Sequence, residues 1–222
     1  SAATAIRVPE TLALRAAPGS ADRDRVRLAL PDGHAQGPTV AALAAAGIAI
    51  DGYAEKASVR RPRIGVGGVD VKVIRPQDMP QQVAIGQFDL AVTGRDWLFD
   101  HLVQFPASPV EEVADLRRAR YGLAVIVKDV EAGSVAGALD EWRRKRPGMP
   151  VRVASEYPNI ADHFARERHF GRYSVIPIAG ASEGFVPDDA EILIEGIDTG
   201  SSVRANRLTV LERFFESTNI VI

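Results

Sequence analysis

Short apolar segments, each ended by Gly, Pro or a polar turn, alternate with helical patterns along this 222-residue chain. This alternation constrains the fold more than any other feature of the sequence. The expected strands are 26–30, 69–74, 88–92, 121–127, 151–154, 172–178 and 191–197. The expected helices are 39–46, 80–85, 130–146 and 159–169, and residues 58–68 are expected to form a loop or hairpin. Strands that alternate with helices favour an α/β protein whose sheets are largely parallel.

Two similar turns suggest two similar lobes. Thr93-Gly94 and Thr199-Gly200 each end a strand, and an acid, Asp89 or Glu195, stands four residues before each threonine. Segments 110–118 and 208–215 are expected to be the later helices of the two units. We expect an N-terminal extension (1–24), lobe I (25–120), lobe II (121–217) and a strand crossing back towards lobe I (218–222). The alternative is that the two short turn sequences resemble each other by chance.

Composition limits the classes of partner. The net charge of −2 offers no general attraction for nucleic acid or an anionic membrane, so any anion must be bound locally. The absence of cysteine excludes disulfides and thiolate chemistry and agrees with a reducing compartment. The apolar runs fall short of the ~20 residues of a membrane span. We therefore expect a soluble protein with neither nucleic-acid nor membrane partners.

The segment 192–208 has the pattern of an anion site, since an apolar strand runs into a small-residue turn followed by a polar helix start. Gly200 allows close approach of the backbone to a ligand, and Thr199, Ser201 and Ser202 supply hydroxyl donors. The first turn of a helix adds unpaired N–H groups at its positive end. A phosphate is the expected guest. The alternative is an ordinary connection in which serine only caps the helix.

Four stretches together resemble the catalytic subunit of ATP phosphoribosyltransferase, in the order and at about the spacing of that family. They are Arg75-Pro-Gln-Asp-Met-Pro80 with the segment 86–96, Arg152-Val-Ala-Ser-Glu-Tyr-Pro-Asn159, Ile178-Ala-Gly-Ala-Ser-Glu183, and the segment 199–208. The resemblance implies a two-lobed fold like the type II periplasmic binding proteins, with a ligand cleft between the lobes. It also implies Mg2+-dependent attack by adenine N1 of ATP on the anomeric carbon of phosphoribosyl pyrophosphate (PRPP), which releases pyrophosphate in the first step of histidine biosynthesis. A cytoplasmic oligomer, with a possible separate regulatory subunit, is expected.

The resemblance also implies which residues bind the substrates. Those expected at PRPP are Glu195, Asp198, Thr199, Gly200, Ser201 and Ser202, of which 198–202 match the stretch that holds the 5-phosphate in the family. Those expected at ATP are Gly33, His34, Arg75, Thr93, Gly94 and Asp96. Glu183 is expected at the ribose hydroxyls or Mg2+. No metal is expected to be held by protein ligands alone, and no catalytic side chain is assigned.

Several of these residues have a plainer interpretation. Asp96 is equally well placed as an acid at a helix N-terminus. Arg75 suits a phosphate through its fork of donors, but also a surface salt bridge. Glu183 is otherwise an ordinary loop acid. Trp97 and Phe99 are expected to pack lobe I rather than stack on adenine.

The sequence also departs from the family pattern. Asp32-Gly33-His34 stands where the family usually has Lys-Gly-Arg or a similar loop, which removes two cations, and Asp198 replaces a serine. His34 is then the weaker donor in place of the lost arginine. These departures leave open a second function, that of a non-catalytic nucleotide- or anion-binding protein on the same fold. A secreted solute receptor is a third interpretation, by fold analogy alone.

Overall fold

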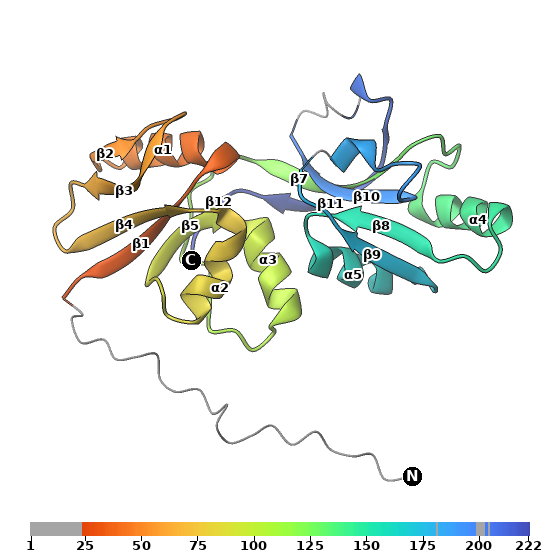
Figure 1. Cartoon of the computed structure of the whole chain (residues 1–222), viewed down its shortest axis with the longest axis horizontal. Coiled ribbons are helices and arrows are strands. Elements are labelled where there is room, and N and C mark those ends of the chain that lie inside the picture. The colour runs from red at the N-terminus through yellow and green to blue at the C-terminus, as the bar shows by residue number, and fades with distance from the viewer. Residues whose placement is uncertain (1–23, 181, 199–202, 204) are drawn as a thin grey trace, which may run out of the picture.

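The computed structural model describes residues 24–180, 182–198, 203 and 205–222 of the chain. Two five-stranded sheets lie side by side and are accompanied by a two-stranded hairpin (Figure 1). Three strands of each sheet pair in parallel. The other two strands of each sheet pair antiparallel with their neighbours, so each sheet is mixed rather than purely parallel.

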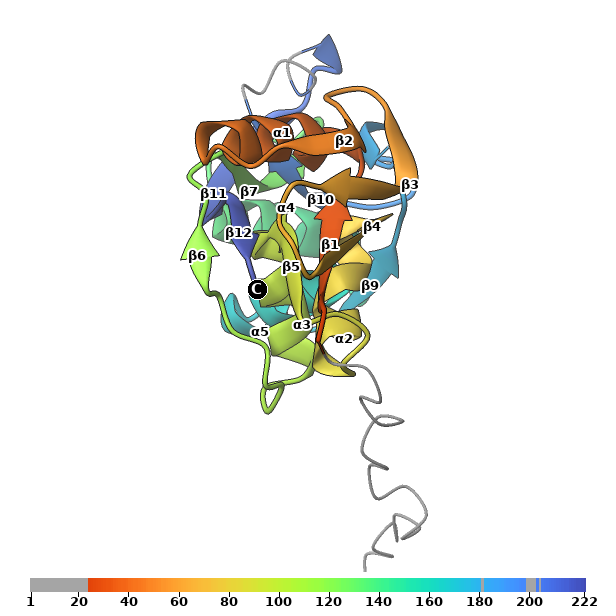
Figure 2. The ribbon, with the colours of Figure 1, turned by 90° about the vertical axis from the view of Figure 1, so that its left-hand side faces the viewer.

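The first sheet is covered on both faces. Its order is β4 (Val69–Ile74), β1 (Val26–Pro31), β5 (Leu90–Gly94), β12 (Asn219–Val221) and β6 (Ala114–Asp115). Helix α1 (Gln36–Ala45) and the hairpin of β2 (Ile50–Tyr53) and β3 (Ser58–Ile64) cover one face, and α2 (Met79–Ala84) and α3 (Arg95–Gln104) cover the other (Figure 2). Alternate residues of β1 explain this: Ala29 packs with the α2 and α3 side, whereas Leu30 packs with the α1 side.

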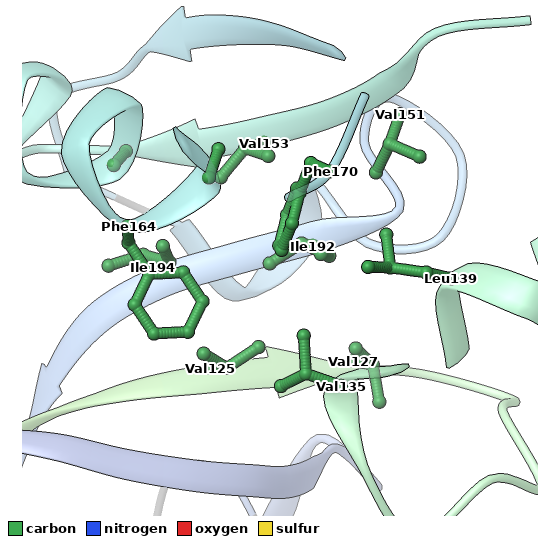
Figure 3. Packing of buried hydrophobic residues seen from close by; sticks show 12 residues of the cluster. Val125, Val127, Val135, Leu139, Val151, Val153, Phe164, Phe170, Ile192 and Ile194 are labelled. Carbon is green, nitrogen blue, oxygen red and sulfur yellow. The ribbon is translucent and has the colours of Figure 1, made fainter. Parts of the chain in front are cut away.

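The second sheet has the order β11 (Thr209–Ser217), β7 (Tyr121–Val127), β10 (Ile192–Ile197), β8 (Val151–Ser155) and β9 (Tyr173–Pro177). Helices α4 (Val135–Lys145) and α5 (Pro158–Glu167) pack on one face, where Phe164 and Phe170 meet Val125 and Ile194 of the strands (Figure 3). The buried positions of α5 are 160, 161, 164 and 165, which form one helix face. The opposite face of the sheet is covered by Val186, Ala190 and Leu208 of the later connections.

Strand predictions in the centre of the sheets are confirmed to within two residues at either end, and β4 and β7 have the expected bounds. Helix α4 begins at Val135 rather than at 130, because Asp129 has a left-handed backbone (φ 55°) and the Ser134 side chain accepts a hydrogen bond from Gly137 N (3.2 Å) as the N-cap. The segment 58–68 forms β3 of the hairpin and a turn.

Two helix predictions are wrong. Segment 110–118 is extended and contains only the short strand β6, and the positive φ of Arg117 (53°) and Ala119 (51°) is incompatible with a continuing helix. Segment 208–215 belongs mostly to β11, whose pairing with β7 shifts register between Val210 and Glu212 and again between Arg213 and Phe215. These irregularities disturb the alternation of period two that would have identified a strand.

The chain passes between the sheets twice, before β7 and between β11 and β12. The last residues lie in the first sheet, where β12 pairs with both β5 and β6. The composition of the sheets follows the proposed lobe I and lobe II, although the residue bounds of the lobes stay a prediction.

A carboxylate of α3 joins the lobes at the start of α5. Asp100 Oδ1 accepts hydrogen bonds from the backbone N–H groups of Asn159 (3.1 Å) and Ile160 (2.9 Å), and Oδ2 accepts from Asn159 Nδ2 (2.8 Å). Asp100 is buried, and this burial raises its pKa, while the three hydrogen bonds act in the opposite direction. The interaction caps one lobe's helix with the other lobe's side chain.

Aromatic rings surround this contact. Trp97 lies 4.3 Å from Tyr157 between ring centroids, and Phe99 stacks on Phe215 at 4.9 Å. Trp97 and Phe99 therefore pack at the junction with lobe II rather than within lobe I alone, which sequence spacing on a single helix could not indicate.

Replacing Asp100 with alanine removes the acceptor for two N–H groups at the start of α5. We expect the free energy of unfolding to fall by about 1–2 kcal/mol. Urea denaturation measures the change, and Asp140→Ala, which removes an exposed acid of α4, is the control and should change stability by less than about 0.5 kcal/mol. Equal stability of Asp100→Ala and the wild type would show that the carboxylate gives no net stabilisation.

Asp115 is expected to stabilise the fold in a way that depends on pH. Asp115 accepts hydrogen bonds from Arg117 N (2.8 Å) and Thr218 Oγ1 (2.8 Å) and pairs with Arg95 (3.1 Å), and these interactions lower its pKa from 3.8 to about 2. Because the folded pKa lies below the unfolded one, this stabilisation is complete above pH 3.8 and is lost as the pH falls towards 2. Asp115→Asn should therefore be less stable than the wild type near neutral pH, and the difference should shrink in acid.

Denaturation series from neutral pH down to about pH 2 measure that difference. Asp51→Asn is the control, because Asp51 is exposed on β2 and makes no side-chain hydrogen bond or ion pair with the described residues. A stability difference for Asp115→Asn that does not depend on pH would contradict the prediction.

Candidate functional site

The carboxyl ends of strands from both sheets meet at the junction between the lobes (Figure 1). In lobe I, β1 leads to the loop at 32–35, β4 leads to Arg75 and β5 ends at Gly94. In lobe II, β8 leads to Glu156 and β10 leads to Asp198. Open α/β sheets bind ligands at such strand ends, so this region is the candidate site.

The residues expected at the 5-phosphate are only partly described. Thr199, Gly200, Ser201 and Ser202 lie outside the described residues, so their role stays a prediction. Asp198 is exposed and lines a cavity of about 610 Å³ at the end of the second sheet. Glu195 lies near the end of β10 and accepts a hydrogen bond from the buried Ser182 hydroxyl. The Glu195 side chain is therefore tied to η4 (Ser182–Gly184), which also contains Glu183.

Lobe I contributes a loop without lysine or arginine. Gly33 has φ 68° and open space around its Cα, and His34 beside it is exposed in η2 (Gly33–Ala35). Arg75 is exposed after β4 and makes no hydrogen bond or ion pair with the described residues. The surface salt bridge considered for Arg75 is thus not present there, and its guanidinium is available to an anion.

Thr93, Gly94 and Asp96 form a tightly packed corner. The Thr93 side chain is fully buried and donates to Pro76 O (2.8 Å). A Cβ at Gly94 would lie 2.1 Å from Asp96 Oδ1, so the packing at this position requires glycine. Asp96 is fully buried in the first turn of α3, as expected for an acid favoured by the helix N-terminus. Contact of these residues with ATP stays a prediction.

Asp96 is the centre of a buried polar cluster that joins the lobes. Ser217 Oγ donates to Asp96 Oδ1 (2.6 Å) and accepts from Asp96 N (3.1 Å). Asp96 Oδ2 is buried without a hydrogen-bond partner among the described residues. The pKa values of the Tyr121 and Tyr157 phenols are raised, first by burial and then by the nearby charge of Asp96. Both tyrosines thus stay neutral and keep their hydroxyl protons.

Tyr121, Tyr157 and Ser217 are not among the residues expected from the sequence to lie in this region. A Cβ at Gly196 would lie 2.7 Å from Tyr121 Cε2 and 3.8 Å from the Tyr157 hydroxyl, so a glycine in β10 makes room for both rings. Tyr157 falls within one of the stretches that carry the resemblance, which was an available signal. Tyr121 and Ser217 come together only through the pairing of β7 with β11, and no local sequence pattern reports that pairing.

A second carboxylate orders the edge of the cleft in lobe II. Glu156 Oε1 accepts from Gly180 N (2.6 Å), and this contact joins the end of β8 to the segment after β9. Ser155 is buried and donates to Ile194 O (2.7 Å) while accepting from Tyr157 N (2.9 Å). These bonds hold the ends of β8, β9 and β10 in one fixed arrangement.

The cavity beside Asp198 extends along the ends of three strands. Its lining includes Arg120, Tyr121, Asp198, Arg213, Phe215 and Glu216. Its volume suits a small phosphorylated ligand. Within the described residues, no group of three or more His, Asp, Glu or Cys side chains could hold a metal ion. In the same part of the chain, no helix has the length and apolar character needed to cross a membrane.

Comparison with solved structures identifies the fold. The ATP phosphoribosyl transferase (HisG:HisZ) complex from Thermotoga maritima superposes with a TM-score of 0.67 at 17% identity, over 88% of this chain and 86% of that chain. The alkanesulfonate-binding protein SsuA from Xanthomonas axonopodis gives a TM-score of 0.50 at 9% identity, over 90% of this chain and 66% of that chain. The expected likeness to periplasmic binding proteins is therefore confirmed for the fold.

Sequence comparison identifies the family. An ATP phosphoribosyltransferase from Prosthecochloris aestuarii is 30% identical over 205 residues, which are 91% of this chain and 65% of that protein. One from Chromobacterium violaceum is 28% identical over 89% of this chain and 88% of that protein. The chain thus spans a little under two thirds of the first relative and most of the second. The family model HisG, ATP phosphoribosyltransferase, matches residues 75–222, from the end of β4 to the last residue, and the chain therefore belongs to the ATP phosphoribosyltransferase family.

Proposed function

We propose that the chain transfers the phosphoribosyl group of PRPP to N1 of the adenine of ATP and releases pyrophosphate, the first step of histidine biosynthesis. The family match carries this proposal, because residues 75–222 include the strand ends of both lobes. The transfer needs little acid–base chemistry, since adenine N1 is already nucleophilic. Positioning and neutralisation of charge supply most of the catalysis. The absence of an assigned catalytic side chain is consistent with this chemistry.

The two lobes have separate tasks in this proposal. The end of β10, with Glu195, Asp198 and the predicted phosphate loop at 199–202, binds PRPP. Gly33, His34, Arg75, Thr93, Gly94 and Asp96 form the ATP side of the cleft, and Glu183 contacts the ribose or its metal ion. The junction between Asp96 and Ser217 fixes the distance between the two sides. This arrangement brings the two reacting atoms together.

Mg2+ fits the site as part of the substrate complex. The described carboxylates that line the cavity, Asp198 and Glu216, do not form a metal site alone, so a bound Mg2+ would take its remaining ligands from the oxygens of the diphosphate. When bound, Mg2+ neutralises the charge of the leaving pyrophosphate.

We also propose a cytoplasmic location, which suits a biosynthetic enzyme that uses ATP. Assembly into an oligomer with a separate subunit is supported by the HisG:HisZ complex of the Thermotoga protein.

The activity is tested by measuring pyrophosphate release from PRPP and ATP, with and without Mg2+ and with an added partner subunit. We expect release that requires both substrates and Mg2+, and that is slow without the partner. Reactions lacking ATP are the control for hydrolysis of PRPP. Binding of PRPP or ATP by calorimetry without any release, even with the partner present, would favour the non-catalytic binding protein.

Asp198 offers a second test, because its carboxylate lines the cavity where a phosphate dianion is proposed to bind. Like charges about 4 Å apart repel strongly, though solvent and salt reduce the effect. We expect Asp198→Ser to tighten PRPP binding by roughly three- to thirtyfold, with a smaller gain at high salt. Weaker binding by the variant would show instead that Asp198 caps the following segment and holds the loop in place.

A further inference from the structure

The cavity beside Asp198 contains an arginine that none of the family-like stretches includes. Arg213 lies on β11, the edge strand of the second sheet, and lines the same cavity as Asp198. Its guanidinium lies close to Gly122 of β7, where a Cβ would be 3.8 Å from Arg213 Nη1. The register shift between Arg213 and Phe215 sets the direction of this part of the strand. The fold thus places a cation at the end of β10 that is distant from it in sequence.

Arg213 differs from several other arginines of lobe II because it has no partner in the described part of the chain. Arg152 and Arg146 pair with Glu191, and Arg168 pairs with Glu212. Arg120, in the same cavity, lies 4.0 Å from Glu216. Arg213 makes no hydrogen bond or ion pair with any described residue, so its five N–H donors are available to a ligand.

The charges around the cavity point to an anionic ligand. With Arg120 beside Glu216, the remaining opposite charges are Arg213 and Asp198. The first loop of lobe I offers Asp32 and His34 but neither lysine nor arginine. A polyphosphate at the end of β10 would therefore meet acids from both lobes, and among the residues that line the cavity Arg213 is the unpaired cation placed to offset them.

We propose that Arg213 is a substrate-binding residue whose guanidinium contacts a phosphate oxygen of PRPP at the end of β10. The inference rests on the proposed function, since it assumes that PRPP occupies this site. A guanidinium suits the task because its planar fork can donate two parallel hydrogen bonds to one phosphate. Phe215 lines the same cavity and, with its ring stacked on Phe99, gives it an apolar side.

The test is calorimetric titration of PRPP into the wild type, Arg213→Gln and Arg172→Gln at low and high salt. Arg172 is the matched control, because it is an exposed arginine of the same lobe that bonds to Gly148 O (2.9 Å) before β9 begins, at the opposite end of the sheet from the cavity. We expect Arg213→Gln to weaken binding by roughly 10- to 100-fold and Arg172→Gln by less than about twofold. Thermal unfolding confirms that each variant is folded. Equal affinity of Arg213→Gln and the wild type would overturn the inference.

A double-mutant cycle with Asp198→Ser separates direct contact from an indirect effect. If Arg213 binds phosphate, the loss caused by Arg213→Gln persists in the Asp198→Ser background. If Arg213 only screens Asp198, the loss disappears there and the inference is wrong. A wild type that binds no PRPP overturns the proposed function as well, whereas a wild type that binds PRPP and releases pyrophosphate, beside an unaffected Arg213→Gln, overturns only the role of Arg213.

Discussion

The contact between Asp100 and the start of α5 determines how the two sheets face each other. Two chain crossings alone would leave the lobes free to rotate about them. The Asp100 carboxylate restricts this rotation, because it accepts hydrogen bonds from two backbone N–H groups whose direction is set by α5. The Trp97–Tyr157 and Phe99–Phe215 pairs add aromatic packing between the same parts of the two lobes. Every strand end that contributes to the candidate site is positioned relative to this contact.

A second feature of the junction is its buried charge. Asp96 is fully enclosed, and only one of its carboxylate oxygens has a hydrogen-bond partner in the described structure. The neighbouring tyrosines stay neutral, and the helix N-terminus of α3 provides the favourable field. Such an arrangement is costly to bury and tolerates little displacement. The buried cluster around Asp96 therefore favours one fixed arrangement of Gly94, Tyr121 and Ser217, and it makes this part of the junction rigid.

The sequence predicted the central strands well because buried parallel strands are continuous apolar runs with clear ends. It predicted a division into two similar units from the Thr-Gly turns, and the residue bounds of those units stay a prediction. The failures were of a different kind. At 208–215 the spacing of Leu208, Leu211 and Phe215 resembles a helix, and the strand accommodates this spacing through register shifts in its pairing with β7, which the local sequence does not report. At 110–119 the positive φ angles of Arg117 and Ala119 could not be inferred from their side chains. Of the candidate site, the strand-end residues were predictable from motifs, whereas Tyr121, Arg213 and Ser217 depend on contacts across strands.

The last strand also has a mechanical role. Asn219 opens β12, and its Nδ2 donates to Ala35 O (3.1 Å) and Thr39 Oγ1 (3.0 Å), where η2 passes into α1. Two residues earlier, Ser217 ends β11 in the second sheet. The edge strand of lobe II is therefore linked to the backbone next to His34 through only three residues of chain, 217–219, and the Asn219 hydrogen bonds. A displacement of β11 along its axis would therefore be transmitted to the loop at 32–35. The two sides of the cleft are mechanically coupled and do not move independently.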